Sequence, residues 1–221
     1  MGALIACSIL SSRALAPLAQ IVSLMTRFNQ SMTALEALDK IIALPSERPS
    51  GKTFLHRPVL LGDIEYKGID FAYPNSETKA LDNFNLSIKA GEKIGILGRI
   101  GSGKSTLERL TLGLYTPQSG SITIDGTDIR QIDPTDLRKN IGYVPQDIYL
   151  FFGSVRDNIT FGSQDIDEDT FNRAALISGV YDFVKLHPHG FDMPVGEGGS
   201  MLSGGQRQAI AVARALVRNP H

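Results

Sequence analysis

Residues 98–106 have the types and spacing of a loop that binds phosphate, because residues 98–105 match the pattern G-x-x-x-x-G-K-[ST]. The glycines let the backbone turn tightly and point its N–H groups at an anion. Lys104 is placed to reach the β- and γ-phosphates of a nucleotide, and the Ser105 hydroxyl is placed to bind Mg²⁺. The candidate binding residues of this loop are Gly98, Gly101, Ser102, Gly103, Lys104, Ser105 and Thr106.

A phosphate loop of this kind lies between a strand and a helix, so the flanking residues test the interpretation. Residues 93–97 have the composition of a buried strand, and Leu107, Leu110 and Leu114 follow at helical spacing. The start of that helix adds free N–H groups and the positive end of a dipole. The alternative is a glycine-rich turn that binds nothing, and the strand, loop and helix together favour the phosphate site.

A second helix start suited to anions is predicted at residues 202–206, Leu-Ser-Gly-Gly-Gln. Ser203 is a natural N-cap for the strongly helix-forming residues that follow. Gly204 and Gly205 remove side chains at a point where free N–H groups face outward. Capping explains Ser203, but it does not explain successive glycines, which weaken a helix start.

The composition limits the classes of function. The 221 residues are enough for one domain and an appendage, and 42% of them are apolar, as in an ordinary packed core. The 22 basic and 23 acidic residues give a net charge of −1, so electrostatics gives no reason to expect nucleic-acid binding. Cys7 is the sole cysteine, which excludes an intrachain disulfide and a cysteine-based zinc site.

The N-terminal region is apolar but interrupted. Residues 2–10 and 14–25 are mainly apolar, with Arg13 and Pro17 between or within them. Neither run reaches the roughly 20 apolar residues of a membrane-spanning helix, and no charge precedes them as in a secretory signal. Three interpretations stay open here: a buried helix of a soluble protein, a helix at a membrane interface, and the cytoplasmic end of a membrane helix.

From Met25 onward, apolar residues recur at spacings of three and four, which predicts a long helix with one apolar stripe. Pro45 disfavours helix at the residue before it, so the helix is expected to end near Leu44. Residues 45–51 combine prolines and a glycine with polar residues, and they are predicted to be a linker at a domain boundary. The stripe consists of Met25, Phe28, Met32, Leu35, Leu38 and Ile42.

Beyond the linker, the pattern predicts further strands at residues 63–71, 84–88, 121–124 and 141–144. Asp133 is a predicted N-cap before Pro134, and residues 155–189 are predicted to be mainly helical. The expected fold class is α/β, with a phosphate-loop core, an antiparallel β subdomain and a small helical subdomain. His187 and His189 are interpreted as a surface turn, because no carboxylate or cysteine spacing supports a metal site.

The order and spacing of these motifs resemble the ATP-binding cassette (ABC) ATPases over residues 60–220. The resemblance rests on Tyr73, the loop at 98–106, Gln146 and the run at 202–206. It implies that ATP and Mg²⁺ are the cofactors. It also implies that two domains dimerise head to tail around two ATP molecules, each site taking the loop from one copy and the 202–206 run from the other.

The resemblance also implies roles for single residues. Tyr73 would stack on adenine, and Lys104 would hold the phosphates. Ser105 and Gln146 would bind Mg²⁺, and Gln146 would also orient water, so Lys104 and Gln146 are the catalytic candidates. The γ-phosphate held by a partner chain would face the start of the second helix, at Ser203, Gly204, Gly205 and Gln206.

Short sequence matches indicate that the exporters are the branch of the family that this chain resembles. Residues 195–199 resemble the exporter loop that contacts the membrane domain, and residues 15–20 with the stripe resemble the last membrane helix of a half-transporter. Residues 97–101 and 207–211 look most like bacterial type I secretion exporters, which move unfolded proteins. The end of a membrane helix therefore becomes the favoured interpretation of the N-terminal region.

This branch implies an organisation, partners and a location. Residues 1–50 are expected to be the end of a transmembrane domain, and residues 58–221 a nucleotide-binding domain that stops before its Walker B strand. Expected partners are a second half-transporter, the membrane domain of the same polypeptide, a periplasmic adaptor and an outer-membrane channel, with no nucleic acid. The expected location is the bacterial inner membrane, with the nucleotide-binding domain on the cytoplasmic side.

Two alternatives are a soluble ABC ATPase of DNA repair or translation and an ABC exporter of peptides or lipids. The near-zero charge and the lack of a Cys-x-x-Cys motif weigh against the first alternative. The family's catalytic glutamate and switch histidine have no match in this sequence. Residues 1–221 alone are therefore expected to hydrolyse little ATP.

Overall fold

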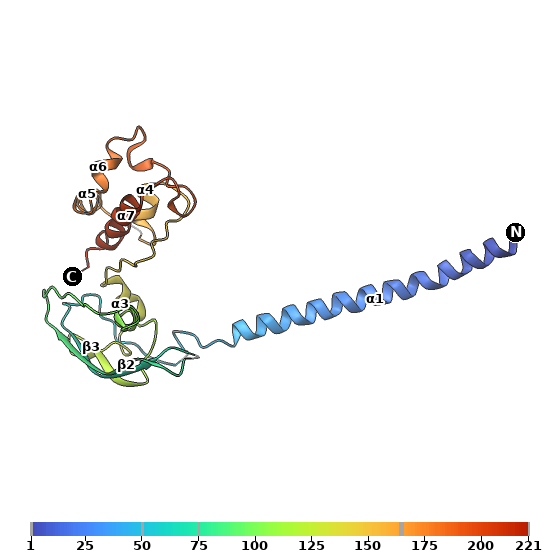
Figure 1. Cartoon of the computed structure of the whole chain (residues 1–221), viewed down its shortest axis with the longest axis horizontal. Helices are drawn as coiled ribbons and strands as arrows, with labels where there is room; N and C mark the ends of the chain where they lie inside the picture. The colour runs from blue at the N-terminus through green and yellow to red at the C-terminus, as the bar shows by residue number, and fades with distance from the viewer. Residues whose placement is uncertain (1, 50, 75, 164–165, 221) are drawn as a thin grey trace. The chain divides into compact units, whose positions relative to one another are not determined.

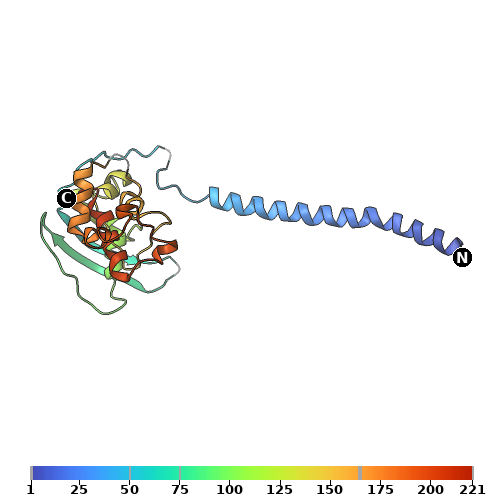
Figure 2. The same cartoon turned by 90° about the horizontal axis from the view of Figure 1, so that it is seen from above.

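The computed structural model describes residues 2–49, 51–74, 76–163 and 166–220. The chain divides into two compact units, Met1–Lys52 and Thr53–His221. The first unit is built on one long helix, α1 (Gly2–Ile42), which contains Pro17 and is drawn in blue in Figure 2. The helix ends just before the predicted position, and its apolar stripe is exposed. No helix among the described residues combines the length and the apolar content that crossing a bilayer requires.

The second unit contains a four-stranded antiparallel sheet in the order β2-β1-β3-β4. Figure 1 labels β2 and β3 of this sheet. The strands are β1 (Ile64–Ala72), β2 (Lys79–Ile88), β3 (Ser119–Ile124) and β4 (Thr127–Asp128). One face of the sheet packs on the helix α2 (Lys104–Thr111), because alternate strand residues and the leucines of α2 are apolar. The largest fully buried side chains of this core are Ile69, Phe71, Leu110, Ile122, Ile124 and Ile132.

Asp70 of β1 joins three parts of this sheet region. Its carboxylate accepts hydrogen bonds from the Lys79 ammonium at 2.9 Å, the Asn83 backbone N–H at 3.0 Å and the Ser119 hydroxyl at 2.6 Å. The hydrogen bonds from Ser119, Asn83 and Lys79 favour the ionised form, so they hold the pKa of Asp70 well below its usual range. Asp70 therefore helps to fix the pairing of β1 with β2 and β3.

The strands predicted at residues 93–97 and 141–144 are wrong for this structure, because neither segment belongs to a strand. A strand is defined by ladder hydrogen bonds to a neighbour, and neither segment has such a neighbour among the described residues. Their apolar side chains are correspondingly open, with Ile96 46% and Leu97 97% exposed. The predictions at 63–71, 84–88 and 121–124 are confirmed by β1, β2 and β3.

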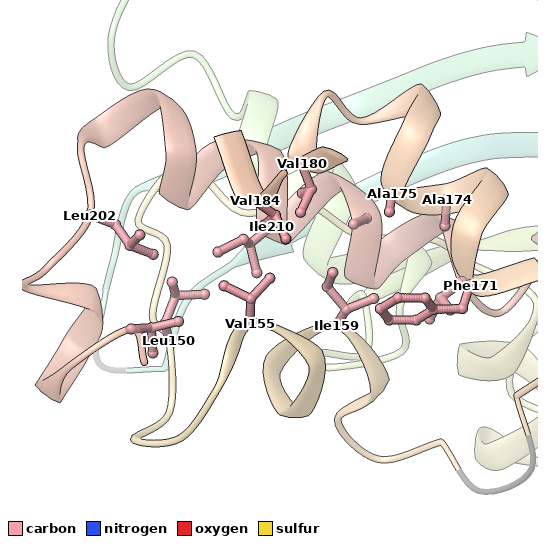
Figure 3. Packing of buried hydrophobic residues seen from close by; sticks show 13 residues of the cluster. Leu150, Val155, Ile159, Phe171, Ala174, Ala175, Val180, Val184, Leu202 and Ile210 are labelled. Atoms are coloured by element: carbon pink, nitrogen blue, oxygen red, sulfur yellow. The ribbon is translucent and has the colours of Figure 1, made fainter. Parts of the chain in front are cut away.

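The C-terminal half of the second unit is helical, as predicted. It contains α4 (Val155–Thr160), α5 (Glu168–Ile177), α6 (Val180–Val184) and α7 (Gly204–Leu216), with short 3-10 helices at Gly190–Asp192 and Glu197–Gly199. Figure 3 shows the labelled side chains of this helical cluster pointing toward one another. Its fully buried members include Leu150, Val155, Ile159, Phe171, Ala175, Val180 and Ile210. Leu202, just before α7, and Ile210, within it, both belong to this core, so the core positions the start of α7.

Residues 55–63, here named the entrance segment, lie at the start of the second unit and are held there by a backbone bridge between Leu55 and Ile132 and by side-chain hydrogen bonds. The carboxylate of Asp136, on α3 (Pro134–Lys139), accepts a hydrogen bond from the Arg57 N–H at 2.8 Å. The Asn140 side chain accepts from the Leu60 N–H at 3.2 Å and donates to the Pro58 carbonyl at 3.1 Å. Asp125 accepts from the N–H groups of Leu61 and Asp63 at 2.7 and 3.0 Å.

Candidate functional site

The predicted phosphate loop leads directly into α2, and Lys104 is the first residue of that helix. The Lys104 ammonium donates to the carbonyls of Gly98 and Arg99, both at 2.8 Å, and lies 3.4 Å from the Ser102 hydroxyl. A lysine that spans its own loop in this way closes the loop into a ring of polar groups around one positive charge. This arrangement suits a phosphate, which would offer the ammonium anionic oxygens in place of neutral carbonyls.

Gly103 fixes the loop against the sheet. It adopts a positive φ of 87°, and a Cβ at this position would lie 2.6 Å from the backbone carbonyl oxygen of Ala80 in β2. Gly101 also has a positive φ, 83°, but an added Cβ there would meet nothing within 4 Å. Glycine is therefore required at 103 by close backbone approach as well as by conformation.

Tyr73, the expected adenine-stacking residue, lies beside α2 at the end of β1. Its ring packs edge-on against Phe71 and Tyr115, with centroid distances of 5.0 and 5.2 Å. Its hydroxyl lies 3.0 Å from the Thr106 hydroxyl and accepts a hydrogen bond from the Arg109 guanidinium at 3.1 Å. The hydrogen bond to Tyr73 raises the pKa of Arg109 above its usual value, so the guanidinium keeps its charge.

The start of α7 has the predicted N-cap, Ser203, and this N-cap is part of a capping box with Gln206. The Ser203 hydroxyl accepts from the Gln206 N–H at 3.2 Å, and the Gln206 side chain accepts from the Ser203 N–H at 2.9 Å. This capping box engages the Gln206 side chain within its own chain. Ser203, Gly204 and Gly205 are all exposed, and a Cβ added at either glycine would meet nothing within 4 Å.

A cavity of about 1290 Å³ brings several of the candidate residues together. Lys104, Ser105, Gln146 and Gly204 all line it, although they come from α2, a loop and the start of α7. The other candidate residues do not line it: Gly98, Gly101, Ser102, Gly103 and Thr106 of the loop, and Tyr73, Ser203, Gly205 and Gln206. Residues 93–97 and 141–144, which belong to no strand, contribute apolar side chains to its wall: Ile94, Ile96, Tyr143 and Val144.

The donor atoms in this cavity fit a hard cation. Ser105, Gln146 and Asp147 line the cavity and carry a hydroxyl, an amide oxygen and a carboxylate, respectively. Mg²⁺ prefers oxygen ligands and usually keeps several waters, so a few protein oxygens beside bound phosphates are sufficient. Among the described residues, no group of three or more His, Cys, Asp or Glu side chains could hold a metal on its own. His187 and His189 lie in a turn, as predicted.

The sequence analysis missed Arg109, which contacts Tyr73 and also lines the cavity. Helical spacing could have indicated it, because residues three and four positions apart share a helix face and Arg109 follows Thr106 and Ser105 at these intervals. Arg207 and Gln208 of α7 also line the cavity and were not proposed as site residues.

The phosphate loop ahead of α2, the flanking antiparallel sheet and the capped α7 start together define an ABC ATPase domain. The chain belongs to the ABC transporter family, whose model matches residues 81–221. An ABC ATPase domain implies nucleotide binding. A solved bacterial Atm1-family ABC exporter with ATP bound has the same fold, with a TM-score of 0.73 and 31% identity over 87% of this chain and 34% of the exporter.

The chain is similar throughout its length to toxin translocation proteins. The alpha-hemolysin translocation ATP-binding protein HlyB of Escherichia coli O157:H7 is 42% identical over 220 residues. The leukotoxin translocation ATP-binding protein LktB of Mannheimia glucosida and the toxin RTX-III translocation ATP-binding protein of Actinobacillus pleuropneumoniae show the same identity of 42%. In each case the alignment covers 100% of this chain and 31% of the relative, so the chain spans about a third of these proteins.

Proposed function

We propose that this chain is the ATP-binding and ATP-hydrolysing part of a bacterial type I secretion exporter that moves proteins across the inner membrane. Residues 1–50 form the end of its transmembrane domain, and residues 58–221 form a nucleotide-binding domain on the cytoplasmic side. ATP and Mg²⁺ are the cofactors. The partners are a second half-transporter, the membrane domain of the same polypeptide, a periplasmic adaptor and an outer-membrane channel. The similarity to the hemolysin and leukotoxin translocation proteins supports this choice of substrate class.

The observation that carries the proposal is the pair of glycines at the start of α7. Glycine inside a helix is less favourable than alanine by roughly 0.5–1 kcal/mol. Neither Gly204 nor Gly205 has a positive φ, and neither has a neighbour that a Cβ would meet. Nothing in the chain itself therefore requires glycine at these positions. Close approach by a molecule from outside, such as the γ-phosphate held by a second copy, supplies the missing reason.

In this mechanism the residues of the loop bind and orient the triphosphate. Lys104 exchanges the carbonyls of Gly98 and Arg99 for phosphate oxygens, which strengthens its hydrogen bonds because the acceptor becomes anionic. When bound, Mg²⁺ would neutralise phosphate charge, held by Ser105 and Gln146. Gln146 orients the attacking water, and the second copy's α7 start completes the site.

Replacing Ser203 with arginine tests the shared site. The arginine would fill the space above the exposed helix start, so we expect unchanged ATP affinity for the single chain and loss of ATP-dependent self-association. Equilibrium dialysis measures the first quantity and sedimentation velocity with and without ATP the second. Ser154→Arg is the matched control, because Ser154 caps α4 with a similar capping box. Weakened binding by the monomeric Ser203→Arg chain would contradict the shared site.

A second test concerns turnover. We expect residues 1–221 to bind MgATP but to release phosphate at no more than a background rate, because the sequence matches no residue to the family's catalytic glutamate. Steady-state phosphate release, measured beside ATP binding on the same sample, checks this expectation. Robust hydrolysis that Lys104→Ala abolishes would show that the described residues are catalytically sufficient.

A further inference from the structure

The segment that follows Gln146 is tied to the helical cluster by one buried asparagine. Asn158 of α4 is 1% exposed, and its side chain bonds both polar groups of the Phe151 backbone. The Asn158 amide oxygen accepts from the Phe151 N–H, and its amide nitrogen donates to the Phe151 carbonyl, both at 2.8 Å. Leu150, beside Phe151, is fully buried in the helical cluster (Figure 3). The chain is therefore fixed a few residues beyond Gln146, which is itself exposed and lies in a bend.

Arg214 of α7 completes this anchor. Its guanidinium donates to the Asn158 side-chain oxygen at 3.0 Å, to the Asn158 carbonyl at 2.8 Å and to the Tyr149 carbonyl at 3.2 Å. It also lies 5.8 and 5.9 Å from the ring centroids of Phe151 and Phe161, within the range of a cation–π contact. One side chain thus orients Asn158 and holds the backbone at Tyr149.

The surroundings of Arg214 are costly for a cation. Burial lowers the pKa of its guanidinium, because a charged group loses hydration inside a protein. Its three acceptors are carbonyl and amide oxygens, which carry no full charge. Burying a charge costs free energy unless the group is well hydrogen-bonded. The compensation for burying Arg214 therefore depends on the position of the segment after Gln146 and of the asparagine that holds it.

The segment before Gln146 also rests on α7. A Cβ at Gly142 would lie 3.0 Å from the carbonyl oxygen of Ala215, the residue after Arg214, so the backbone at Gly142 packs closely on the last turn of α7. At the other end of the helix, Gly204 lines the same cavity as Gln146. The last turn of α7 therefore contacts both flanks of the Gln146 bend, and its first turn reaches the cavity.

We propose that Arg214 is a positioning residue, which fixes where the Gln146 side chain lies in the cavity by holding residues 149–151 on α7. The inference rests on the proposed function, in which Gln146 and Ser105 bind Mg²⁺. This ion demands near-ideal octahedral geometry, so its ligands must be placed closely. Outer groups that hold a metal ligand commonly change the metal affinity 10–100-fold when they are removed. Arg214 does not line the cavity, so its effect passes through the segment.

The test measures how far Mg²⁺ strengthens ATP binding to residues 1–221, as the ratio of the affinities with Mg²⁺ and with EDTA in isothermal titration calorimetry. Arg214→Met removes the donors and keeps an apolar stem, so it should lower this ratio about tenfold and leave the affinity for metal-free ATP unchanged. Gln146→Ala removes the ligand itself and should lower the ratio at least as much. The variant with both changes should match Gln146→Ala, because Arg214 acts through Gln146.

The matched control is Arg218→Met. Arg218 also holds an earlier loop, donating to the Ser163 hydroxyl at 2.8 Å and to the Gly162 carbonyl at 2.7 Å, but neither residue takes part in the proposed metal site. It should keep the ratio of the unchanged chain. Urea unfolding shows which variants are folded. Arg214→Lys keeps the charge but loses the planar fork of donors, so it should also lower the ratio and carries the test if Arg214→Met does not fold.

Each other outcome counts against the inference. An unchanged ratio in the folded Arg214→Met or Arg214→Lys chain would overturn it, and so would losses that multiply in the double variant. An equal loss of affinity with and without Mg²⁺ would also overturn it, since the site would then be loosened as a whole. If Gln146→Ala kept the full ratio, the inference would fail while ATP binding by the phosphate loop stood. If the unchanged chain bound no ATP, the proposed function would fail, and the inference with it.

Discussion

Replacing Lys104 with alanine is expected to weaken MgATP binding by about 100-fold, because the loop loses its one ammonium for the phosphates. Charge-assisted hydrogen bonds contribute up to about 3 kcal/mol, and every 1.4 kcal/mol is about tenfold in affinity. The fold should survive, because Lys104 contacts loop carbonyls and not the core. Titration calorimetry with MgATP measures the loss of affinity.

The control for this prediction is Lys185→Ala. Lys185 is an exposed lysine at the end of α6 that pairs with Asp182 at 3.2 Å, far along the sequence from the phosphate loop. It carries the same charge, so it tests whether net charge alone changes the affinity. Equal binding by Lys104→Ala and the unchanged chain would contradict the assignment of the phosphate loop.

Replacing Gly103 with alanine is expected to lower the free energy of unfolding by about 2 to 5 kcal/mol. A left-handed conformation costs a residue with a Cβ about 1–2 kcal/mol, and overpacking adds about 1–3 kcal/mol. Both terms apply here, since φ is 87° and the new Cβ would lie 2.6 Å from the Ala80 carbonyl oxygen. That oxygen belongs to β2 and moves only if the strand moves. Urea unfolding gives the measurement.

Gly101→Ala is the matched comparison, because it has a similar φ of 83° and open space around its Cβ position. We expect it to lose only the conformational part, about 1–2 kcal/mol. The difference between the two variants therefore isolates the contact between the loop and β2. Equal losses in both variants would mean that this contact does not hold the loop in place.

The local features of the site could be predicted from the sequence because they depend on neighbouring residues. Ser203 caps α7 and Asp133 caps α3, where its side chain accepts from the Thr135 N–H at 2.7 Å. The helix after the loop and the strand β1 also follow from short-range patterns. The glycines at the start of α7 could also be singled out from the sequence, because glycine has a low helix propensity.

The features that could not be predicted depend on parts of the chain that are distant in sequence. Residues 93–97 have the apolar composition of a strand, but composition cannot supply the neighbour that a ladder requires. The contact of Arg109 with Tyr73 joins residues from α2 and the end of β1. The hydrogen bond that the Arg109 guanidinium donates to the Tyr73 oxygen can be recognised only once both side chains are known to meet.

The grip on the entrance segment has a mechanical consequence for the second unit. Asp136, Asn140 and Asp125 hold the backbone of residues 55–63 at points that the chain reaches only 62 to 82 residues later. A pull applied at Thr53 would first load the backbone hydrogen bonds of Leu55 with Gln131 and Asp133. It would then load the side-chain hydrogen bonds of the segment in turn, each of which is individually weak. Tension would thus reach α3 and the β3–β4 turn before it could peel β1 from its sheet.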